Sequence, residues 1–152
     1  MGWLDRLFKM VFRKRALDNS TRNLMRDKFK ISGYWYPLCD KKRIDDVEYF
    51  EKEVFLDKYG EKKTINLLNQ LGDKTINEIV EVGNDKKISV DNLDLTSDET
   101  FYCNDNVDWI IYCSHEKTFT IGGKILLDKF KTDWPELDKY KDPWATKNGG
   151  SA

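Results

Sequence analysis

The run Val-Asp-Trp-Ile-Ile-Tyr-Cys at residues 107–113 places the strongest constraint on the fold of this chain. Its β-branched and aromatic residues favour an extended strand. Because the apolar side chains are almost continuous and do not alternate with polar ones, both faces of this strand should be buried. Such a strand belongs in the interior of a sheet, with further layers of structure packed on it.

Helical and extended patterns on either side of this run indicate the rest of the fold. Apolar residues recur with helical spacing in five segments, which are residues 3–16, 19–30, 45–59, 65–71 and 125–130. Short extended runs occur at residues 76–82, 87–90, 101–103 and 118–121. We therefore predict an α+β fold with N-terminal helices, an antiparallel sheet of about four to five strands, and a C-terminal helix packed on the sheet. The predicted core contains Phe50, Leu68, Ile79, Trp109, Ile111 and Leu126.

The size of the chain suits one domain. Its 152 residues match a domain of ordinary length, and no linker or internal repeat divides them. We expect a single α+β domain over residues 1–147, of which residues 1–30 form a basic helical segment. Asn-Gly-Gly-Ser-Ala at residues 148–152 is typical of a flexible tail or an expression scar.

The cysteines and the N-terminus indicate a reducing compartment. Cys39, Cys103 and Cys113 are odd in number and widely spaced, unlike a disulfide framework or a zinc site. The first fifteen residues mix charges with apolar side chains, so they lack the continuous apolar core of a secretory signal. We predict a cytoplasmic protein with free thiols and no metal.

Charge is divided unevenly along the chain. Residues 1–30 contain nine Lys and Arg against three Asp and Glu, whereas the rest contains seventeen against twenty-four. Residues 88–116 contain no Lys or Arg at all. An acidic stretch is usually a solvated surface, but it can also bind a basic partner, and nearby aromatic rings can anchor an interface. The predicted partner-binding residues are Asp94, Asp98, Glu99, Phe101, Tyr102, Asp105 and Asp108.

A catalytic role for the single histidine, His115, is the alternative hypothesis. Ser114 and His115 are sequence neighbours whose side chains alternate in direction, so they do not suit a nucleophile and its base. A small enzyme would instead pair His115 with Cys103, Cys39 or a carboxylate such as Glu116. No phosphate loop, dinucleotide fingerprint or metal motif is present, and no cofactor is predicted.

A third hypothesis concerns the basic N-terminal helix. Trp3, Leu7 and Phe8 lie among Arg6 and Lys9, a pattern typical of a helix on an anionic membrane surface as well as of a helix that covers a sheet. The acidic body of the chain would repel phosphate, so nucleic acid is not a predicted partner.

One segment resembles a known family pattern. Trp109-Ile110-Ile111-Tyr112-Cys113-Ser114-His115-Glu116, followed by a short strand, Gly122-Gly123 and a helix with Trp134 after it, resembles an uncharacterised bacterial family with a W-x-x-Y-x-S-H-E motif. The Tyr34-Trp35-Tyr36-Pro37 element resembles the aromatic segment that precedes it there. Proteins of this kind resemble immunity proteins of bacterial toxin systems, which bind a toxin without catalysis. The resemblance therefore implies a non-enzymatic protein-binding module with a toxin as partner, and it supplies no catalytic residues. The acidic stretch leads us to expect that this partner is basic.

Overall fold

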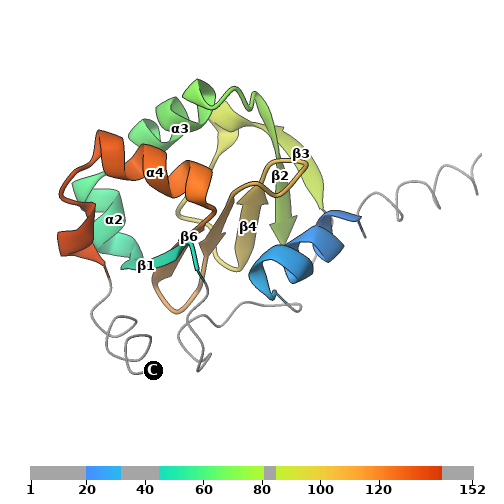
Figure 1. Cartoon of the computed structure of the whole chain (residues 1–152), viewed down its shortest axis with the longest axis horizontal. Coiled ribbons are helices and arrows are strands. Elements are labelled where there is room, and N and C mark those ends of the chain that lie inside the picture. The colour runs from blue at the N-terminus through green and yellow to red at the C-terminus, as the bar shows by residue number, and fades with distance from the viewer. Residues whose placement is uncertain (1–19, 32–44, 81–84, 142–152) are drawn as a thin grey trace, which may run out of the picture.

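A six-stranded antiparallel sheet forms the centre of the protein (Figure 1). The computed structural model describes residues 20–31, 45–80 and 85–141. The strands are β1 (Val47–Glu51), β2 (Thr75–Val80), β3 (Lys86–Ser89), β4 (Thr100–Cys103), β5 (Ile110–Cys113) and β6 (Thr118–Gly122). Their spatial order is β1-β6-β5-β4-β2-β3, and every neighbouring pair is antiparallel. The predicted α+β class is confirmed, and the sheet is larger than the four to five strands expected.

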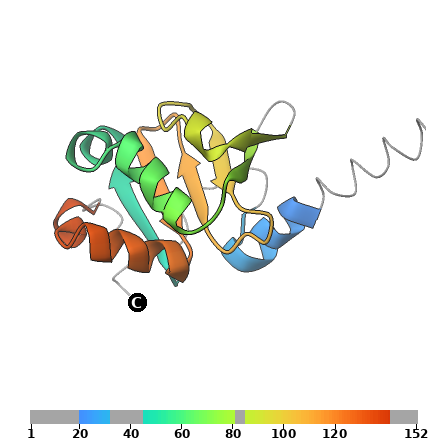
Figure 2. The same cartoon turned by 90° about the horizontal axis from the view of Figure 1, so that it is seen from above.

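Helices pack on both faces of this sheet (Figure 2). They are a helix over residues 20–29, α2 (Lys52–Lys58), α3 (Glu61–Gln70) and α4 (Lys124–Asp133), with short 3-10 turns η1 (Val90–Asn92) and η2 (Leu137–Tyr140). Helices α2, α3 and α4 share one face, and the helix over residues 20–29 lies on the other. Strand β1 precedes α2 and α3 along the chain, which corrects the expectation that the helices come first.

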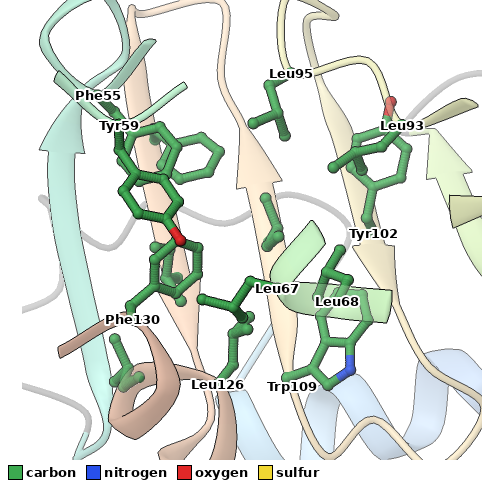
Figure 3. Close-up of a cluster of buried hydrophobic side chains, with 14 of the residues drawn as sticks. Phe55, Tyr59, Leu67, Leu68, Leu93, Leu95, Tyr102, Trp109, Leu126 and Phe130 are labelled. Atoms are coloured by element: carbon green, nitrogen blue, oxygen red, sulfur yellow. The ribbon is translucent and has the colours of Figure 1, made fainter. Parts of the chain in front are cut away.

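The larger core lies between the sheet and helices α2, α3 and α4 (Figure 3). Aromatic rings contact one another within it: Phe55 stacks on Phe119 with 4.1 Å between ring centroids, and Tyr59 stacks on Trp134 at 5.3 Å. Burial of such rings supplies much of the hydrophobic stabilisation of a domain.

The second core lies on the opposite face of the sheet. There Met25 and Phe29 from the helix over residues 20–29 pack with strand residues such as Ile79, Phe101 and Ile110. Because β5 contributes Ile111 to one core and Ile110 to the other, it is buried on both faces as its composition predicts. All six predicted core residues are buried.

The segment at residues 45–59 is only partly helical, which corrects the prediction of one helix there. Its first half is strand β1, which pairs with β6 through contacts such as Phe50 with Phe119. Helix α2 begins only at Lys52. Val47, Phe50 and Val54 have helical spacing, but the pairing partner lies about seventy residues away in sequence, and tertiary contacts of this kind override local propensity.

Strand β5 is shorter than the predicted run at residues 107–113. A turn occupies its start, where the Asn104 side chain accepts a hydrogen bond from the Asp108 backbone N–H at 2.8 Å and Val107 takes a positive φ of 51°. The predicted helix at residues 3–16, the aromatic segment near Tyr34, Cys39 and the tail at residues 148–152 all lie outside the described residues.

Candidate functional site

The acidic stretch at residues 88–116 does not form one surface. Strand β4 runs from Thr100 to Cys103, and the antiparallel β5 returns beside it. Asp98 and Glu99 therefore precede β4 at one end of the sheet, whereas Asp105 and Asp108 follow it at the opposite end. The predicted acids therefore do not lie side by side, because the four-residue strand β4 separates the two pairs.

The aromatic anchors proposed for this surface are buried. Phe101 is 1% exposed, and Tyr102 is fully enclosed. Strand β4 lies between β5 and β2, and its side chains alternate between two covered faces, so Phe101 enters one core and Tyr102 the other. The prediction that they belong to a partner-binding surface is therefore wrong, since neither ring reaches solvent.

Three segments converge at the end of the sheet where β4 begins. The backbone N–H of Lys52, at the start of α2, donates to the carbonyl of Lys117 at 2.8 Å. The Lys52 ammonium donates to the carbonyl of Ser97 at 2.7 Å. Six acids from these segments are exposed or partly exposed, and we call them the acidic end: Glu51, Glu53, Asp94, Asp98, Glu99 and Glu116.

Lys52 holds the acidic end together from beneath. Its side chain is only 10% exposed, and its ammonium lies 3.0 Å from Asp98 Oδ1. A second carbonyl, that of Thr96, accepts at 3.4 Å. A buried ammonium requires such partners, because leaving it unpaired costs several kcal/mol. The positive charge of Lys52 is thus paired within the acidic end, and the acids around Lys52 face solvent.

Glu99 fixes the β5–β6 turn to the acidic end. Its carboxylate accepts hydrogen bonds from the His115 backbone N–H at 3.0 Å and from the Tyr112 hydroxyl at 3.1 Å, and it also contacts His115 Nδ1. Glu99 itself takes a positive φ of 53°, a conformation that is costly for a residue with a side chain. These bonds offset that cost and hold the exposed imidazole in place.

The structure separates His115 from the cysteine predicted to act with it. The His115 side chain is 58% exposed on the β5–β6 turn, whereas Cys103 ends β4 at the opposite end of the sheet and is fully buried. Burial raises the pKa of the Cys103 thiol to about 12, so it is not a ready nucleophile. The predicted pairing of His115 with Cys103 is therefore wrong, and the imidazole instead contacts Glu99, not Glu116.

The motif residues that carried the family resemblance have structural partners. The Trp109 indole N–H donates to Asp73 at 2.9 Å, and the Ser114 hydroxyl accepts from the Glu116 backbone N–H at 3.1 Å. Together with the Tyr112–Glu99 bond, they organise β5 and the turn that follows it. Neither the cavity that Lys63 and Asp133 line nor the one that Arg22 and Phe101 line includes these side chains.

The second pair of predicted acids lies in the β4–β5 turn. Asp105 accepts from Lys87 at 2.7 Å and from Asn77 at 3.1 Å, and the Lys87 hydrogen bond lowers its pKa. Asp108 accepts from the Asn104 amide at 3.0 Å. Asp105 is thus bound to the neighbouring strands β2 and β3, and Asp108 is bound within the turn. Within the described ranges, no group of three His, Cys, Asp or Glu side chains could hold a metal ion.

Glu51, Glu53 and Lys52 were missed as site residues by sequence reasoning. They were assigned to the interior of one long helix, where their charges would point to solvent without relation to the loop before β4. The triplet Glu-Lys-Glu at the junction of a strand and a helix is the only sequence signal for these site residues. It can be recognised only once β1 is known, because the junction is not apparent without it.

Comparison of the chain with protein-family models, curated proteins and solved structures finds no match. Among the helices in the described part of the chain, none combines the length and apolar character needed to cross a bilayer. The residues proposed for membrane-surface contact, from Trp3 to Lys9, precede the first described residue.

Proposed function

We propose that this chain is a non-enzymatic protein-binding module of the bacterial immunity type, and that its acidic end meets a basic protein partner such as a toxin. The convergence of six acids from three segments carries this proposal. The same three segments contain only two lysines, Lys52 and Lys117. Since Lys52 is buried against Asp98, the charge offered to solvent is strongly negative.

Electrostatics of this kind suits recognition of a cationic surface. A cluster of like charges raises the local concentration of an oppositely charged partner and speeds its association. The cluster also repels acidic proteins, which gives partner choice. The internal bonds of Lys52, Glu99 and His115 fix the three segments relative to one another, so little ordering would be needed on binding.

Capture from the source cell tests this proposal. The immobilised full chain is incubated with lysate at low salt, and bound proteins are identified by mass spectrometry. We expect one stoichiometric basic protein, and we expect the Glu51→Gln, Glu53→Gln, Glu116→Gln triple variant to lose most of it. These three glutamates are exposed, so their replacement leaves the fold intact.

A matched control uses the acids at the opposite end of the sheet. The Asp105→Asn, Asp108→Asn double variant removes two charges but keeps side chains that can accept the same hydrogen bonds. We expect it to capture the partner as wild type does. Equal capture by the triple variant and wild type would contradict the proposal, as would loss of capture in the control alone.

A further inference from the structure

A cleft of about 250 Å³ lies between helices α3 and α4 and shares no residue with the acidic end. Its lining consists of Lys63, Asn66, Leu67 and Gln70 from α3 and Asp133 from the end of α4. The four α3 residues follow the three- and four-residue spacing of one helical face. Four of the five lining side chains are polar, and three kinds of polar group are therefore available within one small space.

Two opposite charges line this cleft without neutralising each other. Both are organised by the buried Tyr59: the Lys63 ammonium lies 5.7 Å from the centroid of its ring, and the Tyr59 hydroxyl donates to Asp133 at 2.7 Å. In the described ranges, no ion pair within 4.0 Å joins Lys63 to Asp133 or either of them to another side chain. An ammonium and a carboxylate thus line a common space without an ion pair between them.

The carboxylate is positioned in advance. Burial raises the pKa of Tyr59 above its ordinary value, so its hydroxyl keeps the proton with which it holds Asp133. The amides of Asn66 and Gln70 make no hydrogen bond with other described side chains or backbone, and each supplies both donors and an acceptor. Leu67, which is almost fully buried, forms the apolar part of the wall.

We infer that this cleft binds a small zwitterion, namely a free α-amino acid. Lys63 would meet the ligand carboxylate, Asp133 would meet the ligand ammonium, and Leu67 would contact its side chain. The volume lies below the range of roughly 300–1,000 Å³ that is usual for sites of larger ligands, which limits the ligand to this size. The inference is independent of the proposed protein partner, because the two sites share no residue.

Titration of the isotope-labelled full chain with L-valine, followed by NMR amide shifts, tests this inference. We expect saturable shifts in α3 and α4 with a dissociation constant on the order of 1 mM, typical of a small open site. N-acetyl-L-valine lacks the ammonium and L-valinamide lacks the carboxylate, so each should bind about tenfold more weakly. Absence of saturable shifts, or equal binding of all three compounds, would overturn the inference.

Variants of the two charges provide the second arm of this test. Lys63→Met keeps the aliphatic stem but removes the charge, and Asp133→Asn keeps the shape of the side chain. Each should weaken L-valine binding about tenfold. Lys62→Met, on the next residue of the same helix but outside the cleft, should bind as wild type does. Unchanged binding by Lys63→Met would also overturn the inference, whether or not Asp133→Asn remains folded.

Discussion

The Lys52 ammonium lies 3.0 Å from Asp98 Oδ1, beneath a surface on which the other charges are mainly negative. This contact joins the first turn of α2 to the loop that precedes β4, two segments separated by more than forty residues of sequence. It makes the acidic end a defined arrangement, since the position of each acid depends on how these segments are held together.

Replacement of Lys52 by Met should therefore destabilise the protein and loosen this loop. The Ser97 and Thr96 carbonyls and the Asp98 carboxylate lose a charged donor, and hydrogen bonds to charged groups contribute about 1.5–3 kcal/mol. Urea unfolding should show a loss of that size, and hydrogen exchange should accelerate at residues 96–99. Lys129→Met, on an exposed position of α4, should change the stability by less than about 0.5 kcal/mol. Equal stability of the two variants would contradict the assigned role of Lys52.

The bond between Trp109 and Asp73 should be a second point of sensitivity. Asp73→Ala leaves the indole N–H of a fully packed ring without its acceptor, which should cost about 1–3 kcal/mol. Asp73→Asn retains a carbonyl oxygen at the same place and should cost clearly less. Thermal unfolding of the two variants separates these cases, and an equal loss in both would show that the charge of Asp73, not the hydrogen bond, is what matters.

The junction between β6 and α4 should tolerate no side chain at Gly123. An added Cβ would lie 2.4 Å from the Asp108 carbonyl oxygen, and the residue has a φ of +105°. Gly123→Ala should therefore lose about 3 kcal/mol or more. Gly72 has a similar φ of +90° but nothing within 4 Å, so Gly72→Ala should show only the conformational cost of about 1–2 kcal/mol. The difference between the two unfolding free energies isolates the steric clash.

Stability should fall in alkaline solution because of the buried thiols. Burial raises the pKa of Cys103 and of Cys113 from the ordinary value of 9.0 to about 12. The unfolded state then releases its protons first, so the contribution is complete below about pH 9 and is lost as the pH rises toward about 12. By about pH 10 each thiol should lower the unfolding free energy by an amount on the order of 1 kcal/mol.

Urea unfolding at a series of pH values measures this effect. Cys113→Ala should lower the stability at neutral pH through the cavity it creates, but it should also reduce the alkaline slope. An alkaline slope identical to that of wild type would contradict the assignment of the slope to this thiol.

The elements with strong local signals were predictable from the sequence. Runs of apolar residues, together with the residues that end them, predict three of these elements. They are the β5–β6 hairpin, helix α3 ending before Gly72, and helix α4 ending at Trp134. Strand β1 was not predictable in this way, because its identity depends on pairing with β6 and its own residues also satisfy helical spacing.

The candidate site was predictable only in part. The sequence indicates that residues 88–116 are acidic, but the division of these acids between two ends of the sheet depends on where β4 begins and ends. Phe101 and Tyr102 were assigned to a surface because they stand beside acids. Their burial depends on β4 being an interior strand, which requires knowledge of strand order.

The most direct test of the account measures how fast the purified partner associates with the chain, as a function of ionic strength. For wild type, the association rate constant should fall steeply as salt is added. For the Glu51→Gln, Glu53→Gln, Glu116→Gln variant, the rate at low salt should be about tenfold lower and nearly independent of salt. Identical rates and salt dependence in the two proteins would contradict the central claim that the acidic end receives the partner.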